Sequence, residues 1–482
     1  QSSHALLGAN RLDEAETMLQ RAIDILVNLR QNLSDLYTIS VLDTQVHTYN
    51  LLQQVLVAQT NYAKALEVAE QGRAQALIDL VAADNPSRND WTTAAYADLQ
   101  AVAQQQQATL VEYTLVPEDT FKFKFQAKQR GQTAQLFIWV IQPTGELHFQ
   151  QQAISDLELP LESLIAQSRR NLAGDRGLWR SIQVAPLAEA AEIGEPLQRL
   201  HQILIAPIQD WLPTNPEAQV ILIPHEALFL VPFAALQAAD ETALIEHHTL
   251  AIAPSIQLLA VSQSNASAAS ASALIVGNPV MPSLALSPGD TPQQLPPLLG
   301  AEQEAIAIAQ LLKTDALLGE MATETRVAAQ MEQAPLIHLA THGLLDLNLP
   351  TADFTQLQNP GAIALAPSTT ADGWLTSPEI AALDLKADLV VLSACDTGLG
   401  EITGDGVVGL ARSLLGAGAK STVVSLWAVP DAPTAELMVA FYQQLFAGRG
   451  KAHALRQAML HTKANHPNPR DWAAFVLIGN PG

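Results

Sequence analysis

Two short hydrophobic runs that end in small or polar residues predict neighbouring buried strands. One run spans 389–392 and stops at the small-residue turn that contains Cys395. The other spans 335–340 and stops just before His342 and Gly343. Continuous apolar runs of this length are typical of strands that are buried on both faces of a parallel sheet. Because sites in open α/β sheets collect at the carboxyl ends of neighbouring strands, the pattern predicts that His342 and Cys395 lie close together.

The first third of the chain changes from a helical to a strand pattern across a polar boundary. Residues 5–83 show the spacing of amphipathic helices, and the proline-broken stretch 84–92 predicts a linker. Residues 109–115 then alternate between apolar and polar side chains, as in a half-buried strand. The runs 136–141 and 147–150 flank a Pro-Thr-Gly turn, which predicts a hairpin.

Further along, strands and helices alternate, which indicates an α/β fold with a helical N-terminal segment. Strands are predicted at 219–224 and 274–279, and helices at 157–171, 185–211 and 301–313. A proline-rich stretch from Pro279 to Pro297 predicts a surface loop that is long enough to be functional.

The N-terminal helices resemble degenerate tetratricopeptide repeats. Aligning Ala15 with Ala65 gives a repeat longer than the ~34 residues of that family. At most about two repeats are present, which is fewer than a stable stack needs. Either more repeats therefore lie upstream of Gln1, which is not an initiating methionine, or these helices pack on the rest of the chain. They serve either as a groove for a protein partner or as a packed helical cap.

The net charge restricts the kinds of partner that the protein binds, and the cysteine content indicates its cellular compartment. Acidic residues outnumber basic ones 48 to 25, which gives a net charge of −23. This balance argues against direct binding to nucleic acid or to an anionic membrane, because phosphate attraction needs a basic surface. No stretch is apolar enough to predict a transmembrane helix. A single cysteine among 482 residues excludes an internal disulfide, which fits a cytoplasmic protein.

The pairing of a histidine with the single cysteine predicts nucleophilic chemistry. A thiolate forms at neutral pH when a base or a positive field lies beside the thiol, and an imidazole supplies it. The alternative is a small buried cysteine near a hydrogen-bonded histidine, since free cysteine is often buried. His338 competes for the role of base, but it lies mid-strand, so we favour His342. We expect no cofactor and no metal, because no second ligand lies at zinc spacing from His225.

Three ordered blocks resemble the CHAT family, the caspase-like domains found beside tetratricopeptide repeats. They are the segments 338–343 (His-Leu-Ala-Thr-His-Gly), 393–398 (Ser-Ala-Cys-Asp-Thr-Gly) and 223–236, and the resemblance covers roughly residues 95 to 482. His342 also precedes Cys395 by roughly 50 residues, as in caspase-like proteases. The caspase signature Gln-Ala-Cys-x-Gly is absent, so caspase substrate rules do not transfer.

The resemblance implies a cysteine endopeptidase with a caspase-like, mostly parallel sheet flanked by helices. His342 would be the base and Cys395 the nucleophile, with the backbone N–H groups of Gly343 and Cys395 holding the oxyanion. Asp396 would orient a basic substrate or raise the thiol pKa.

The segment 423–431 resembles a block of separase-type proteases, in which acidic residues after a tryptophan bind an arginine of the substrate. Trp427 and Asp431 are the matching substrate-pocket residues, whereas Ala428 and Ala432 depart from that block.

These patterns divide the chain into a helical segment and a CHAT domain. We expect helices like those of tetratricopeptide repeats (TPR-like helices) over 1–83, the linker over 84–92, and the CHAT domain over 93–482. Within that domain, 93–260 would be a supporting, pseudo-caspase half and 261–482 the catalytic half. The expected partners are a protein or peptide substrate and a protein bound to the TPR-like helices. The alternative function is a signalling scaffold that binds protein partners without cutting them.

Overall fold

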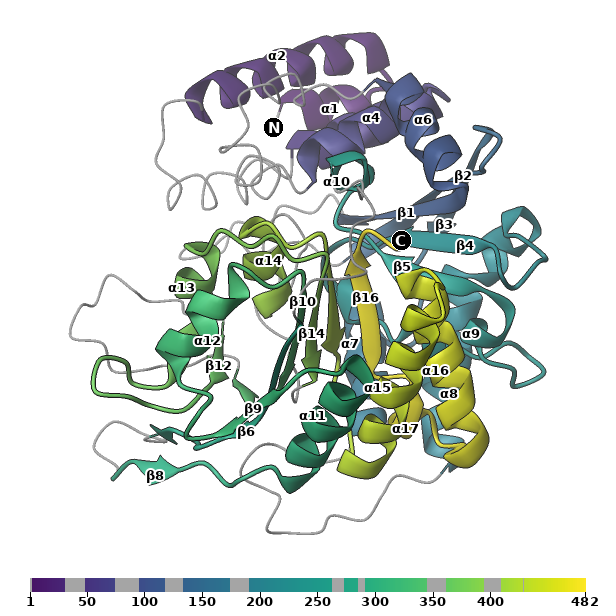
Figure 1. Cartoon of the computed structure of the whole chain (residues 1–482). Coiled ribbons are helices and arrows are strands. Elements are labelled where there is room, and N and C mark those ends of the chain that lie inside the picture. Colours follow the sequence, from purple (N-terminus) through teal and green to yellow (C-terminus); the bar gives the residue numbers. More distant parts are fainter. Residues whose placement is uncertain are drawn as a thin grey trace.

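The computed structural model describes residues 2–30, 48–73, 95–117, 133–173, 190–261, 273–284, 291–344, 361–393, 409–427 and 429–482. One 11-stranded sheet runs through it in the order β3-β2-β1-β4-β5-β16-β15-β14-β10-β6-β9 (Figure 1). The strands are β1 (Ala108–Pro117), β2 (Thr133–Ile141), β3 (Leu147–Ala153), β4 (Gln219–Ile223), β5 (Thr249–Ile252), β6 (Leu274–Pro279), β9 (Ala316–Gly319), β10 (Leu336–Ala340), β14 (Leu389–Ser393), β15 (Ser421–Ser425) and β16 (Phe475–Gly479).

Most neighbouring strands of this sheet are parallel, which confirms the predicted fold class. The exceptions are the β1-β2-β3 meander and the pair of β15 with β16, which are antiparallel. The strands β10 and β14 match the two hydrophobic runs, and they pair in parallel with Ala340 opposite Ser393. His342 and Cys395 each come two residues after this pair in the sequence.

Helices cover the sheet and form the predicted N-terminal segment. Among them, α11 (Leu299–Leu312), α15 (Asp431–Phe446) and α16 (Lys451–Asn465) pack side by side, with α11 against β6 and β10 (Figure 1). The helices of the N-terminal segment are α1 (Ser2–Gly8), α2 (Leu12–Arg30), a helix over 48–58 and α4 (Tyr62–Gly72), and α6 (Tyr96–Gln106) comes directly before β1. The others are α7 (Leu161–Ala173), α8 (Ala190–Leu204), α9 (Leu244–His247), α10 (Ile256–Val261), α11 (Leu299–Leu312), α12 (Glu324–Met331), α13 (Ser377–Ala381), α14 (Gly409–Gly416), α15 (Asp431–Phe446), α16 (Lys451–Asn465) and α17 (Pro469–Trp472).

Short strands form two further sheets beside the carboxyl ends of β6 and β10. One holds β11 (Gly343–Leu344), β12 (Ala362–Ala364) and β13 (Trp374–Thr376). The other pairs β7 (Ser283–Leu284) with β8 (Gln293–Gln294) inside the proline-rich stretch. None of the helices in the described ranges is both long and apolar enough to cross a membrane.

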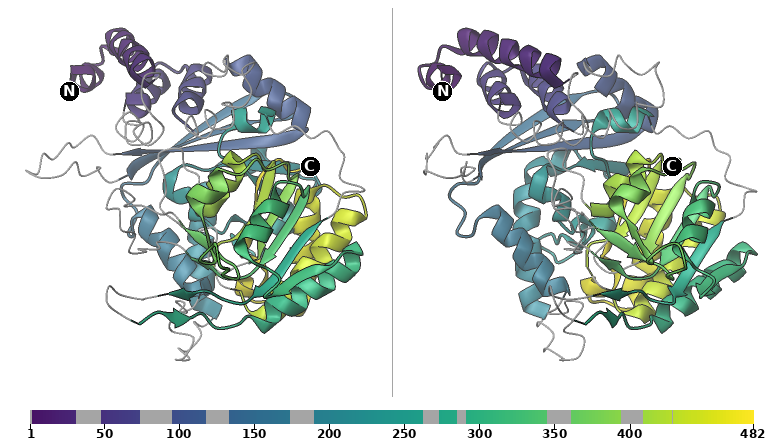
Figure 2. Two further views of the ribbon diagram at one scale, coloured as in Figure 1. Left: turned by 60° about the vertical axis from the view of Figure 1, so that its left-hand side comes forward. Right: turned by 90° about the vertical axis from the view of Figure 1, so that its left-hand side faces the viewer.

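The N-terminal helices pack on the long strands β1 and β2 (Figure 2). The indole N–H of Trp139 in β2 donates to the carbonyl of Tyr62 over 3.0 Å, and the ring of Tyr62 stacks on Phe149 at 4.4 Å. Consequently β1 is buried along nearly its whole length, so the prediction of a half-buried strand over 109–115 is wrong. The helices cover the face that the alternating pattern assigned to solvent. The predicted linker over 84–92 lies outside the described residues.

A buried charged cluster joins α4 to this sheet. Arg73, which follows α4, places Nε 2.8 Å from Oε1 of Glu112 in β1, and its Nη1 donates to the carbonyl of Pro224 over 2.7 Å. Glu70 accepts from the backbone N–H groups of Ile256 and the next residue, each over 3.1 Å, at the start of α10. All three ionisable side chains of this cluster are buried, so they contact protein groups and not water.

Candidate functional site

His342 lies just beyond the carboxyl end of β10, where backbone contacts fix its position. Its carbonyl accepts from the N–H of Ala364 in β12 over 2.9 Å. The hydroxyl of the preceding Thr341 donates to the Ala364 carbonyl over 2.7 Å. These bonds anchor the strand end to the small sheet, whose first residue is Gly343.

The ring of His342 is held in one tautomer. Its Nε2 lies 2.9 Å from the carbonyl oxygen of Pro296, and a carbonyl oxygen only accepts, so Nε2 carries the hydrogen. In a neutral ring, Nδ1 is then the acceptor. Nδ1 is buried and has no hydrogen-bond partner among the described residues. Within the described part of the chain, this basic nitrogen is therefore left without a partner, on the side of the ring away from Pro296.

The surroundings of His342 favour its neutral form. Burial, the largest cause, lowers its pKa below the ordinary histidine value, since a low dielectric penalises the charged ring. The Pro296 carbonyl and the carboxylate of Asp431 act in the opposite direction and raise the pKa in part. An imidazole that is neutral at neutral pH is able to accept a proton from an acid beside Nδ1.

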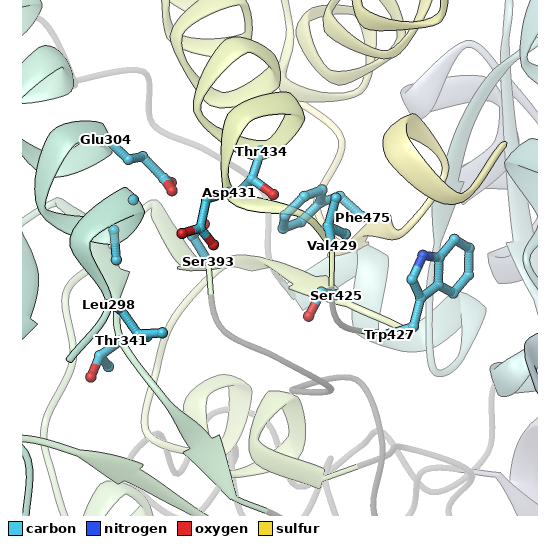
Figure 3. A pocket seen from close by; sticks show the side chains of 12 residues that line it. Leu298, Glu304, Thr341, Ser393, Ser425, Trp427, Val429, Asp431, Thr434 and Phe475 are labelled. Atoms are coloured by element: carbon cyan, nitrogen blue, oxygen red, sulfur yellow. The ribbon is translucent and has the colours of Figure 1, made fainter. Parts of the chain in front are cut away.

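A cavity of about 50 Å³ lies beside this strand end, bounded by the ends of β10, β14 and β15 and by α11 and α15 (Figure 3). Its polar wall consists of two carboxylates and several hydroxyl groups, and its apolar wall includes an indole and a phenyl ring. The described residues that line it are Leu298, Gly300, Ala301, Glu304, Thr341, Ser393, Ser425, Trp427, Val429, Asp431, Thr434 and Phe475. In Figure 3, Glu304 lies at the left and Trp427 at the right, with Asp431 between them beside Ser393.

Asp431 and Trp427, both predicted for the substrate pocket, line this cavity. Asp431 begins α15, and its carboxylate occupies the space that a side chain at Gly300 would take, since a Cβ there would come within 2.3 Å of it. That places the carboxylate at the first turn of α11, where the helix dipole favours negative charge. Trp427 is fully buried, and its indole N–H donates to the Arg470 carbonyl over 3.0 Å.

His338, the alternative candidate for the general base, is buried in the interior of the fold. Its side chain is fully buried between α11 and α15, with Nδ1 3.1 Å from the hydroxyl of Tyr442. Its Nε2 lies 3.0 Å from Oε1 of Glu304, the buried carboxylate that also lines the cavity. Both ring nitrogens therefore face protein groups.

Two of the predicted site residues, Cys395 and Asp396, lie outside the described residues. The strand that leads to them, β14, is described up to Ser393, which lines the cavity.

The sequence interpretation missed the Pro296 carbonyl and Glu304. A backbone carbonyl has no side-chain signature, and the one available signal was the length of the proline-rich stretch that contains Pro296. Glu304 sits in a helix that was predicted correctly, but its partner His338 lies on a distant strand.

The arrangement of the sheet defines the class of the protein, a caspase-like α/β fold. Two crystal structures of the separase–securin complex from Saccharomyces cerevisiae match 94% of this chain and 38% of theirs. Their TM-scores are 0.56 and 0.51, at 12% and 11% identity. At this identity the likeness concerns the fold alone.

The family is shown by the match of the CHAT domain model to residues 194–480, which is more than half of the sequence. The chain belongs to the CHAT domain family. It is also similar to tetratricopeptide repeat protein 28 of Homo sapiens and of Mus musculus, at 26% identity in both cases. These alignments cover 99% of this chain and 24% of each relative, so the chain spans about a quarter of the length of these relatives.

Proposed function

We propose that this chain is a cysteine endopeptidase that uses Cys395 as nucleophile and His342 as general base. The main support for the proposal is the hydrogen bonding of the His342 ring. Its Nε2–H donates to the Pro296 carbonyl, while the buried Nδ1 has no partner among the described residues. The pairing of Ala340 with Ser393 supports it, because His342 and Cys395 follow these paired residues at equal distance along their strands.

In the proposed mechanism, Nδ1 of His342 takes the proton of the Cys395 thiol, and the thiolate attacks the peptide carbonyl. The resulting oxyanion is held by the backbone N–H groups of Gly343 and Cys395. The imidazolium then gives its Nδ1 proton to the leaving amine as the C–N bond breaks. Water, deprotonated by the same nitrogen, hydrolyses the thioester and releases the acid and the thiol. Asp431 stabilises the transient imidazolium through its charge.

The cavity provides the proposed substrate pocket. Asp431 and Glu304 supply two carboxylates, and Trp427 and Phe475 supply flat apolar surface. Such a lining favours a basic side chain, whose methylene stem packs on aromatic rings while its charge meets a carboxylate. Asp396 is proposed as a further acidic contact.

We also propose the division of the chain given by the sequence: helices over 1–83, a linker over 84–92, and a CHAT domain over 93–482 with halves 93–260 and 261–482. In this scheme, a protein partner on the TPR-like helices regulates the protease. The name of the tetratricopeptide relatives supports this assignment of the helices.

The test is intact-mass labelling with iodoacetamide across pH, comparing the wild type with His342→Ala. Any adduct is at Cys395, the single cysteine. We expect fast labelling that persists to about pH 6, below the pKa of an ordinary thiol, and a loss of about tenfold or more in His342→Ala. His247→Ala, at an exposed histidine, is the matched control and should label like the wild type. Labelling as slow as a free thiol and indifferent to His342 would instead favour the signalling scaffold.

A further inference from the structure

The segment that presents the Pro296 carbonyl to His342 is fastened to the end of β6. Among residues 295–298, the two prolines have no N–H. The N–H of Leu295 donates to the carbonyl of Pro282 over 3.1 Å. The N–H of Leu298 donates to Oδ1 of Asn278 over 2.7 Å. Every backbone donor of the segment is therefore used to hold it, and one of the two acceptors is a side chain.

Asn278 is built into the joint between β6 and α11. It is buried, its φ is +42°, and its Nδ2 donates to Oε2 of Glu302 in α11 over 2.8 Å. The preceding Gly277 lets the helix come close, since a Cβ there would lie 2.3 Å from that of Ala305. This position requires a residue that adopts the left-handed backbone conformation and whose side chain has both an acceptor and a donor. Asparagine meets both conditions.

We propose that Asn278 is a positioning residue for His342. It acts through Leu298: the Asn278 side chain fixes the end of the 295–298 segment, and this fixes the Pro296 carbonyl against Nε2. That carbonyl selects the tautomer that leaves Nδ1 free to accept. The importance of the tautomer for activity rests on the proposed function, whereas the coupling of Asn278 to the ring does not.

The side chain is tested separately from the backbone by Asn278→Gly. Glycine adopts a positive φ without strain but removes both side-chain bonds. We expect the labelling rate of Cys395, or kcat where a substrate is known, to fall about 10- to 100-fold with KM little changed, as for a misplaced catalytic group. Asn10→Gly, at the positive-φ turn before α2, is the matched control and should not change the rate.

A second variant separates the two bonds of Asn278. Asn278→Asp also tolerates a positive φ and keeps an acceptor for the N–H of Leu298, but it replaces the bond to Glu302 by repulsion between two carboxylates. Because the bond to Leu298 remains, we expect Asn278→Asp to keep the wild-type tautomer of His342. This variant replaces Asn278→Gly in the test if the glycine variant does not fold.

The decisive readout is the protonation of the His342 ring by ¹⁵N NMR, with the His342→Ala spectrum identifying its signals among the 12 histidines. We expect the Nε2–H tautomer in the wild type and in Asn278→Asp, and a mixture of tautomers in Asn278→Gly. A pure Nε2–H ring in Asn278→Gly would overturn the proposal. If wild-type labelling is slow and independent of His342, the proposed protease function fails, but the NMR result still decides the role of Asn278.

Discussion

Replacing Glu112 by glutamine should remove a pH dependence from the junction between the N-terminal helices and the sheet. The carboxyl groups of Glu70 and Glu112 belong to the same buried cluster. Burial, the largest cause, raises the pKa of both groups, and that of Glu112 is well above the ordinary value. The negative charge of Glu70 also contributes to raising the pKa of Glu112. Arg73 lowers the pKa of both carboxyls in part, and Glu70 also accepts two backbone N–H bonds that favour its charged form, so we expect Glu112 to hold a proton.

The size of this pH dependence follows from the binding of one proton. Above the ordinary carboxyl pKa of 4.5, the closed junction holds a proton that the opened chain releases. The stability of the closed junction therefore decreases by about 1.4 kcal/mol per pH unit until the pH passes the raised pKa of Glu112. In Glu112→Gln the side chain at this position binds no proton, so this decrease should disappear. Glu70→Gln should instead cost about 1–3 kcal/mol at all these pH values, since one oxygen replaces two acceptors for two buried N–H groups.

The assay is hydrogen exchange of α10, corrected for intrinsic rates, between about pH 5 and pH 8. Exchange reports local opening and does not require two-state unfolding of the whole chain. Glu320→Gln, at an exposed glutamate, is the matched control and should follow the wild type. Parallel pH profiles for the wild type and Glu112→Gln would show that neither carboxyl holds a proton at these pH values, and the reasoning would be wrong.

Two further substitutions test the walls of the cavity. In Gly300→Ala, the new Cβ would lie 2.3 Å from Asp431 and displace its carboxylate. Labelling by an arginine-containing peptidyl probe should then fall about tenfold, equivalent to about 1.4 kcal/mol, while a leucine-containing probe is unaffected; an equal loss for both probes would refute the pocket assignment. Trp427→Phe leaves the Arg470 carbonyl without its indole donor and should cost about 1–3 kcal/mol in urea unfolding, and an unchanged midpoint would contradict this.

The sequence predicted the features of this fold that have local causes. The apolar runs that became β10 and β14, and the glycine and proline residues that end strands, act through neighbours in the chain. For the same reason, His342 was placed correctly at a strand end.

Features that depend on distant contacts were missed. Glu112 stands in an alternating pattern that normally has one face in solvent, and nothing near it reveals that Arg73 and the N-terminal helices cover that face. The Pro296 carbonyl and the His338–Glu304 pair arise because α11 and its preceding segment fold back on β6 and β10. A single sequence contains no signal for such an approach.

The position of β16 has a consequence for the synthesis of the protein. It is the last described strand in chain order, yet it lies in the sheet between β5 and β15. Chains leave the ribosome N-terminus first, at about 5–20 residues per second, so both flanking strands emerge with open edges before the strand that joins them. Open strand edges invite pairing with other chains until the missing strand is in place. β16 joins the two halves of the sheet, so the complete sheet forms only after every other described strand of that sheet has been synthesised.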